Sequence, residues 1–150
     1  MRRSIAALAV AAALAVTLAA AGSATGSGAA GATVGTSTSR LGRILVDGRG
    51  RTLYLFEKDK GKTSTCYGAC ASIWPPVTTS GEPHAARGAH VGLLGTTRRK
   101  GGKLEVTYAG HPLYLYAGDQ KRGDTNGEGL NQFGAKWYVL APSGKKIDRD

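Results

Sequence analysis

The sequence contains few of the residue types on which most catalytic and metal sites are built. Its 150 residues include two cysteines, three histidines and one methionine, which is Met1. Without another methionine the chain lacks the thioether ligand of blue-copper sites, and no Cys-x-x-Cys-His haem-attachment motif occurs. A Gly-x-Ser-x-Gly elbow, a His-Glu-x-x-His motif and a phosphate-binding loop are also missing. We therefore expect no enzyme, no catalytic residues and no cofactor.

A long hydrophobic run occurs only at the N-terminus. Arg2 and Arg3 form a short basic region before an apolar stretch that ends at residue 21. This pattern predicts a signal peptide over residues 1–21, with cleavage there or as late as residue 24. Residues 22–31, rich in Gly, Ala and Ser, have the composition of a flexible tether. Since no other stretch could cross a bilayer, we expect a secreted or extracytoplasmic protein with no transmembrane segment after cleavage.

Acidic residues are scarce relative to basic ones. The chain has 20 Lys and Arg against 10 Asp and Glu, a formal net charge of +10, which the loss of Arg2 and Arg3 lowers by two to +8. Outside the cytoplasm such a surplus favours anionic envelope polymers or lipid headgroups. The alternative is that it serves only solubility and general adhesion. No basic–aromatic platform stands out, so we expect no specific nucleic acid partner, and the oligomeric state stays open.

The two cysteines, Cys66 and Cys70, lie four residues apart. In an oxidising compartment an isolated pair at this spacing favours a local disulfide that fixes a loop. A metal site would need a second Cys or His pair, and a thioredoxin-type redox motif has two intervening residues where this chain has three. The metal and redox readings therefore remain as alternatives to a structural disulfide.

One segment of the sequence occurs twice, sixty residues apart. Residues 32–59 align without a gap with residues 92–119, with nine identical positions, and the match resumes where Trp74 corresponds to Trp137. A duplication of this kind predicts two similar structural units. The chain after the tether then divides into repeat 1, a linker, repeat 2 and a tail of basic and acidic residues, at 32–81, 82–91, 92–144 and 145–150.

Short runs rich in Val, Thr, Tyr and Leu, bounded by Gly, predict strands in both copies. No helical periodicity persists in the expected mature part. We expect a single small all-β domain of two tandem, pseudo-symmetric, four-stranded antiparallel units, with long loops at 57–72 and 117–135. The expected strands are Thr33–Thr38, Arg43–Val46, Thr52–Phe56 and Trp74–Thr79 in repeat 1, and Val91–Thr97, Lys103–Tyr108, Pro112–Tyr116 and Lys136–Ala141 in repeat 2.

The third strand of each copy carries large apolar residues on both faces. Tyr54 and Phe56 point to one side of the strand, and Leu53 and Leu55 point to the other. We therefore expect these strands to be central and covered on both sides. The aromatic side chains are expected in the core between the repeats, and a stacking surface for a sugar or other flat ligand is the alternative. They are Tyr54, Phe56, Tyr114, Tyr116, Trp74 and Trp137.

Carboxylates end both third strands, at Asp59 and Asp119. Because the residue is repeated, we expect it to cap the following loop, with paired carboxylates or metal ligands as the alternative. Asp124, Asn126 and Glu128 alternate as calcium ligands would, but without the distal Glu of an EF-hand they form only a weak candidate. The histidines, His84, His90 and His111, are scattered along the sequence, so the residues predict no metal site.

These features resemble a known family. Tyr54-Leu-Phe56-Glu-Lys-Asp59 and Tyr114-Leu-Tyr116-Ala-Gly-Asp119 resemble the Tyr-x-aromatic-x-x-Asp motif of the bacterial "secreted repeat of unknown function" family, a group of predicted lipoproteins. The Cys-Tyr-Gly-Ala-Cys-Ala and Trp-Pro-Pro segments and Gly-Asp-Thr-Asn-Gly resemble further elements of that family. The resemblance implies an envelope or secreted location and two repeats, and it implies no established activity. Lipoproteins need a cysteine just after the signal peptide; none is present here, so we expect no lipid anchor.

Taken together, the residues favour an exported, non-catalytic β-domain that acts as a binding or structural module of the cell envelope, with an unknown ligand. The alternative is an envelope redox or metal-handling accessory protein that uses the Cys66 and Cys70 pair or the histidines.

Overall fold

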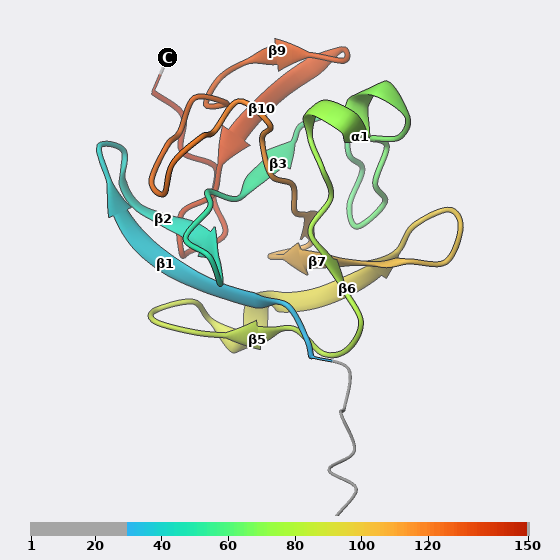
Figure 1. The fold of residues 1–150 in the computed structure, drawn as a ribbon, viewed down its shortest axis with the longest axis horizontal. Helices are drawn as coiled ribbons and strands as arrows, with labels where there is room; N and C mark the ends of the chain where they lie inside the picture. The colour runs from blue at the N-terminus through green and yellow to red at the C-terminus, as the bar shows by residue number, and fades with distance from the viewer. Residues whose placement is uncertain (1–29, 150) are drawn as a thin grey trace, which may run out of the picture.

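Each repeat begins with an antiparallel hairpin in the computed structural model, which describes residues 30–149 (Figure 1). The expected signal peptide and the tether up to residue 29 lie outside the described residues. In repeat 1 the hairpin is formed by β1 (Thr33–Ser39) and β2 (Gly42–Asp47), and in repeat 2 by β6 (Leu94–Arg98) and β7 (Leu104–Tyr108). The hairpins match the first two predicted strands of each copy to within a few residues.

The later strands of repeat 1 pair with strands of repeat 2. β3 (Tyr54–Phe56) lies against β10 (Ala135–Val139), which also pairs with β9 (Asn131–Gln132). β4 (Thr78–Thr79) lies against β7, which also pairs with β8 (His111–Pro112). The two halves are therefore interlocked. The sequence predicts that the four strands of each unit pair with one another, whereas β3 and β4 pair with strands of the other unit.

The exchange is symmetrical at the backbone. The Tyr54 N–H donates to the Tyr114 carbonyl at 2.9 Å, and the Tyr114 N–H donates to the Tyr54 carbonyl at 3.0 Å. Leu140 donates to Leu53 at 3.3 Å, and the corresponding Val77 donates to Leu113 at 2.9 Å. These reciprocal bonds relate the two halves by a pseudo-two-fold axis that passes between Tyr54 and Tyr114.

The gapless alignment of the two copies is wrong by one residue within the second strands. Thr36 pairs with Leu45 in the first hairpin, whereas the corresponding Thr96 pairs with Val106 in the second. The cause is a difference in the length of the connections. Residues 99–103 join β6 to β7, whereas only residues 40–41 join β1 to β2. Leu45 is therefore equivalent to Val106, and Glu105 occupies the position that Ile44 has in repeat 1.

Several predicted elements differ in extent. The expected strand Trp74–Thr79 shrinks to β4, because Pro75 and Pro76 have no N–H to donate to a ladder, and helix α1 (Ala69–Ile73) precedes it. The expected strand Pro112–Tyr116 is extended but keeps only β8 and isolated bridges at Tyr114. A 3₁₀ turn, η1 (Val91–Leu93), replaces the start of the strand predicted from Val91.

The segments expected to be a linker and a tail are also joined to the fold. β5 (His84–Ala85), within the predicted linker, pairs in parallel with β1. In the predicted tail, the Ile147 N–H donates to the Val139 carbonyl at 2.8 Å. Within the described part of the chain no helix has the length and apolarity to span a membrane.

Two apolar clusters form the core, one on each face of β3. Leu53 and Leu55 belong to one cluster, and Tyr54 and Phe56 belong to the other, as the alternation of the sequence predicts. All four side chains are buried. The all-β fold class with two repeats is thus confirmed. β3, which carries Tyr54 and Phe56, lies between the two clusters of the core.

Candidate functional site

The motif tyrosines and aspartates of the two repeats bind each other across the pseudo-two-fold axis. The Tyr54 hydroxyl donates to Asp119 Oδ2, and the Tyr114 hydroxyl donates to Asp59 Oδ2, both at 2.6 Å. The second carboxylate oxygens accept backbone N–H groups of the following loops, from Thr65 at 2.8 Å and from Asn126 at 2.9 Å. Each aspartate therefore caps its own loop and holds the tyrosine of the other repeat.

The burial of these pairs changes their acidity. Desolvation, together with the bond to Asp119, raises the pKa of Tyr54 far above its ordinary value, and burial likewise raises the pKa of Tyr114. Desolvation also raises the pKa of Asp119, although the Tyr54 hydroxyl opposes that shift. Both phenols therefore stay protonated and act as hydrogen-bond donors, which is a structural role.

The other aromatic motif residues form one continuous stack between the two halves. Phe56 lies 3.9 Å from Trp137, Trp137 lies 4.0 Å from Trp74, and Trp74 lies 4.3 Å from Tyr116, measured between ring centroids. Tyr54 and Tyr114 meet the two tryptophans edge-on. Both indole N–H groups donate to Gln132, one to its side chain and one to its carbonyl. Only Tyr116 of this set is partly exposed.

The disulfide between Cys66 and Cys70 is present and is confirmed, with the two Cα atoms 5.3 Å apart. It encloses the start of α1, and its Cys66 carbonyl is bonded to a member of a buried ion pair that the sequence analysis missed. Arg99 donates to Glu105 Oε2 at 2.8 Å, to the Ser64 hydroxyl at 2.8 Å and to the Cys66 carbonyl at 2.6 Å. The Arg99 guanidinium therefore joins the disulfide loop to repeat 2, and the Lys100 N–H adds a bond to the Tyr67 hydroxyl at 3.1 Å.

The buried carboxylate of this pair makes stability depend on pH. Desolvation raises the pKa of Glu105 to about 7 from its ordinary 4.5, against the opposing effect of Arg99. Between these values the folded protein binds a proton that the unfolded chain does not bind, so the stability contribution of Glu105 rises as pH falls through 7 and levels off below about 4.5. We expect thermal melts of the wild-type protein to show this dependence and Glu105→Gln to remove it. The same pH profile in both proteins would contradict the assignment.

The remaining sequence candidates do not come together. The Asp124 carboxylate accepts the N–H groups of Gln120 and Lys121, both at 2.9 Å, and Glu128 accepts the N–H of Val139 at 2.6 Å. Among residues 30–149 no group of three His, Cys, Asp or Glu side chains is placed to hold a metal ion. The histidines lie on separate elements, and burial lowers the pKa of His111.

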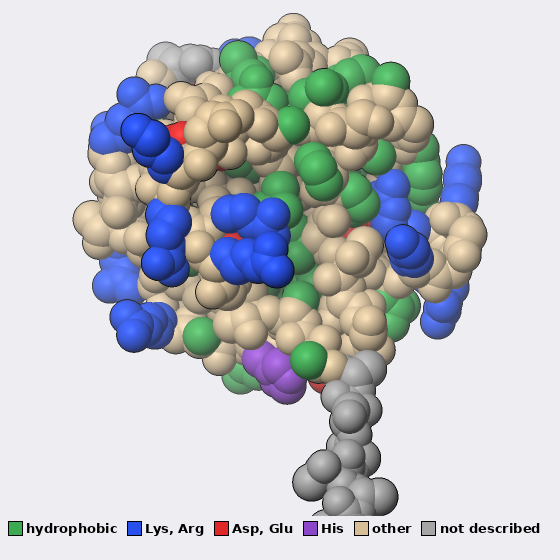
Figure 2. Space-filling view, viewed as in Figure 1, with side chains coloured by type: hydrophobic (Ala, Val, Ile, Leu, Met, Phe, Trp, Pro, Cys, Tyr) green, Lys and Arg blue, Asp and Glu red, His purple; other side chains and the backbone are tan. Residues whose placement is uncertain are grey.

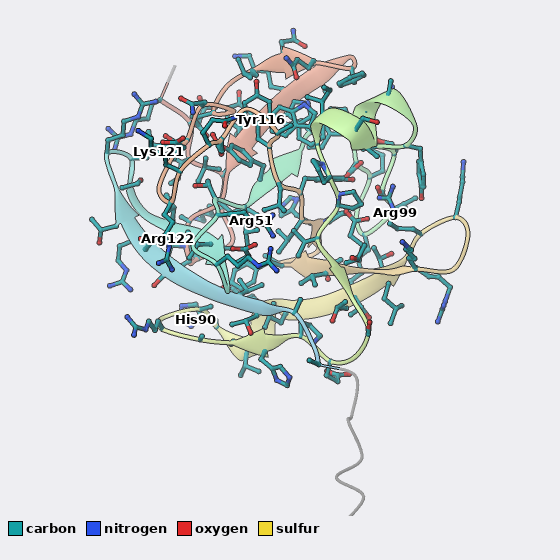
Figure 3. The ribbon with its side chains drawn as sticks, in the orientation of Figure 1. Arg51, His90, Arg99, Tyr116, Lys121 and Arg122 are labelled. Carbon is teal, nitrogen blue, oxygen red and sulfur yellow. A yellow bond between two sulfur atoms is a disulfide. The ribbon has the colours of Figure 1, made fainter. Side chains whose placement is uncertain are left out.

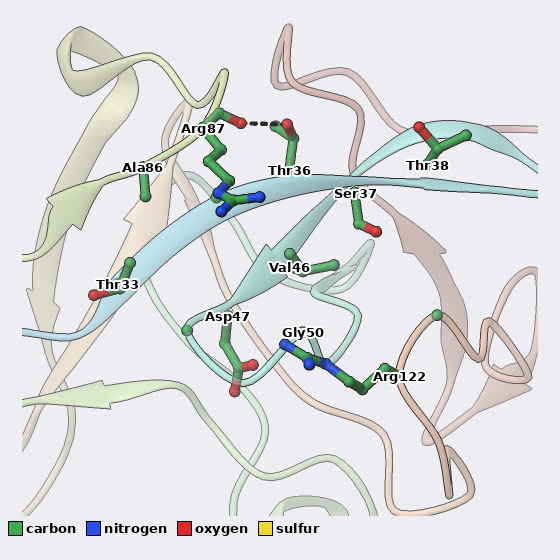
Figure 4. A pocket seen from close by; sticks show the side chains of 13 residues that line it. Thr33, Thr36, Ser37, Thr38, Val46, Asp47, Gly50, Ala86, Arg87 and Arg122 are labelled. Carbon is green, nitrogen blue, oxygen red and sulfur yellow. Dashed lines mark hydrogen bonds between the residues drawn. The ribbon is translucent and has the colours of Figure 1, made fainter.

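A groove of about 600 Å³ runs along β1 and is lined mainly by polar residues and glycines. Its floor carries the hydroxyl-bearing residues of β1, and its walls are the turn at 48–50 and the loops at 86–87 and 122–123. Figure 4 shows Arg87 and Arg122 reaching into it from opposite sides, with Thr36 bonded to the Arg87 carbonyl. The hydroxyl-bearing floor residues are Thr33, Thr36, Ser37 and Thr38.

Local contacts place Arg122 in the groove and a further arginine beside it. A Cβ atom at Gly50, whose φ is +81°, would lie 2.5 Å from Arg122 Nε, so the guanidinium rests directly on this glycine. Arg43 donates to the Thr36 hydroxyl at 2.6 Å and adds a third guanidinium at the rim. Figure 2 shows several Lys and Arg side chains on the left half of the visible surface, with only small areas of Asp and Glu between them.

The groove was not predicted from the sequence, because its residues come from both repeats and from the expected linker. The sequence could have indicated the buried ion pair. When the second strands of the two repeats are aligned with a gap, Glu105 occupies the position of the apolar Ile44. For Arg87 and Arg122, which lie in polar loops, the sequence offers no feature that separates them from other exposed basic residues.

The comparisons with known proteins agree with the two-repeat architecture. Residues 35–78 and 95–141 match the family described as a secreted repeat of unknown function. No curated protein and no solved structure matches the chain significantly. The two matched segments cover more than half of the chain and coincide with the interlocked halves, and the chain therefore belongs to this family of secreted repeats.

Proposed function

We propose that this protein is a non-catalytic binding module of the cell envelope or extracellular space, and that the groove along β1 holds an anionic polymer. The observation that carries the proposal is the pair of guanidinium groups, Arg87 and Arg122, on opposite sides of a groove whose lining includes hydroxyl-bearing residues of β1. Guanidinium and hydroxyl donors together bind carboxylate and phosphate oxygens.

The charges in the groove support an anionic ligand. Within residues 30–149 neither Arg87 nor Arg122 forms an ion pair with a carboxylate. The one carboxylate of the lining, Asp47, is already bound to Arg51 at 2.7 Å and accepts the N–H groups of Arg49 and Arg51. The groove therefore offers positive charge that its own residues do not neutralise.

The alternative, a redox or metal-handling accessory, has less support. Cys66 and Cys70 are bonded to each other, and Arg99 holds the Cys66 carbonyl on the buried side of the loop. The motif aspartates hold tyrosines and backbone amides, which accounts for their repetition without a reaction. An open groove suits an extended polymer better than an enclosed small molecule.

The proposal is tested by removing the two facing guanidinium groups. We expect Arg87→Ala/Arg122→Ala to weaken binding of labelled inorganic polyphosphate by at least about tenfold, since a hydrogen bond to a charged group contributes about 1.5–3 kcal/mol. Binding should also weaken as salt is raised. Fluorescence anisotropy at fixed ionic strength measures the affinity.

The control removes the same charge elsewhere. Lys60→Ala/Lys62→Ala alters two exposed residues that do not line the groove and should bind polyphosphate almost as the wild-type protein does. If both double variants weaken binding equally, net charge alone accounts for the affinity and the groove is not the site. Selective binding to phosphatidylglycerol vesicles, with no affinity for the soluble polymer, would reassign the surface to membranes.

A further inference from the structure

The basic groove continues into two smaller hollows on the same side of the molecule. It shares Thr33, Asp47 and Gly48 with a hollow of about 440 Å³ beyond the turn at 48–50. That hollow in turn shares Arg51 and Leu115 with a pocket of about 170 Å³ that Tyr116 borders. Figure 3 shows Arg122, Arg51 and Tyr116 on this side of the fold. We call the connected hollows, from Arg87 to Tyr116, the track.

Basic groups outnumber acidic ones along the track. Arg87, Arg122, Arg49 and Arg51 line it, against the carboxylates of Asp47 and Asp119. Both carboxylates are engaged, Asp47 with Arg51 and Asp119 with the Tyr54 hydroxyl and the Asn126 N–H. A ligand that follows the track therefore carries negative charge at several positions along its length.

The end of the track differs chemically from its start, because an aromatic ring takes the place of the hydroxyl groups. Tyr116 is the one partly exposed member of the four-ring stack, and Trp74 holds it in place at 4.3 Å. The exposed part of a ring fixed in this way contacts a flat apolar face of a ligand without losing further side-chain freedom. Thr52, Pro75 and Ala117 complete the small pocket beside it.

The corresponding position of repeat 1 lacks these properties. Phe56, the counterpart of Tyr116, is only 2% exposed. The residue after Phe56 is the acidic Glu57, whereas the residue after Tyr116 is Ala117. The hollow beside Phe56 contains His111 in place of Arg51, and Glu57 and Asp59 lie there with Lys145 and Lys146. Lys146 is paired with Glu57 and Asp148. A partly exposed aromatic ring beside an arginine therefore occurs at the Tyr116 end and not beside Phe56, although the two halves share one backbone plan.

We infer that the polymer held by the track is an anionic polysaccharide, whose sugar rings carry its charge, with one ring resting in the pocket beside Tyr116. The inference rests on the function proposed above and deepens it. A polyol phosphate chain satisfies the arginines equally well but has no ring to stack on the tyrosine. The alternation of guanidinium groups with an aromatic ring fits a chain in which charge and flat apolar faces occur together.

The test compares two probes of equal charge, polygalacturonate, which has one carboxylate on each sugar ring, and poly(glycerol phosphate), which has no ring. We expect the wild-type protein to bind polygalacturonate more tightly, by about threefold to tenfold, since one aromatic stacking contact contributes about 0.5–1.5 kcal/mol. Tyr116→Leu should abolish this preference, and Tyr116→Phe, which keeps the ring as repeat 1 does at Phe56, should retain it.

A second variant guards against loss of folding in Tyr116→Leu. Ala117→Leu changes an exposed residue that lines the small pocket and should fill it, again removing the preference with no change of charge. If the wild-type protein binds both probes equally and neither variant matters, while Arg87→Ala/Arg122→Ala weakens both, the polysaccharide assignment is wrong and the polyanion function stands. If the arginine variant weakens neither, both proposals fail.

Discussion

Trp137→Ala is expected to lower the free energy of unfolding by about 3–5 kcal/mol, the range for truncation of a buried large aromatic side chain. Trp137 has no exposed surface and stacks on Phe56 of one repeat and on Trp74, while Tyr114 meets it edge-on at 5.1 Å. Since a whole domain is stabilised by about 5–15 kcal/mol, one such change removes a large share. Chemical denaturation monitored by circular dichroism measures the loss.

The control for this prediction is Val91→Ala, a truncation at an apolar residue that is 74% exposed and should alter stability by no more than about 0.5 kcal/mol. Equal effects of the two substitutions would show that the stack does not stabilise the contact between the halves. The ring of Trp137 would then have to be sought at the surface, where a ligand-binding role would again be open.

Arg99→Met is expected to be comparably destabilising above pH 7, by about 3–5 kcal/mol, because it leaves the Glu105 carboxylate buried without its partner. The same change also removes two hydrogen bonds at the disulfide loop, those from Arg99 to the Cys66 carbonyl and to the Ser64 hydroxyl. Glu105 is fully buried, so water cannot replace the lost guanidinium. Because Arg99 lowers the pKa of Glu105, its removal raises that pKa above 7. Denaturant unfolding over a pH series that extends well above 7 measures the effect and its decline as Glu105 is protonated.

The neighbouring Arg98 offers a matched control, because it is exposed and its side chain, among residues 30–149, donates only to the Gly102 carbonyl. Arg98→Met should change stability by about 0.5 kcal/mol or less. If Arg99→Met behaved like Arg98→Met at every pH, the buried pair would contribute nothing. Adding Glu105→Leu to Arg99→Met should restore much of the loss, since an apolar pair of similar volume avoids the desolvation penalty.

The fold class and much of the core could be predicted because they depend on local patterns. Alternation along Leu53, Tyr54, Leu55 and Phe56 assigns each side chain to a face, whichever strand becomes the neighbour. Export and close spacing suffice to pair Cys66 with Cys70, since no other cysteine competes. The two copies were likewise visible in the sequence, apart from the one-residue shift that the β6–β7 connection introduces.

The candidate site was predicted less well than the fold. Sequence analysis identified the motif residues but not their partners, because the sequence is equally consistent with pairing inside one repeat. The structure shows that Tyr54 binds Asp119 and Tyr114 binds Asp59. Arg87 and Arg122 are 35 residues apart and resemble any exposed basic residues until the loops meet. Glu105 was hidden by an alignment that placed it opposite Leu45.

By itself, the sequence determined that the chain forms two similar β-units, which residues of each unit are apolar on both faces, and that the surface carries excess positive charge. Periodicity and composition encode these properties locally, so they hold for any arrangement of the units. Only the tertiary structure decided that β3 pairs with β10 and β4 with β7, crossing between the repeats. Strand exchange depends on contacts between residues far apart in the sequence, because it buries the four stacked rings between the two repeats. The same tertiary arrangement brings Arg87 and Arg122 to one groove.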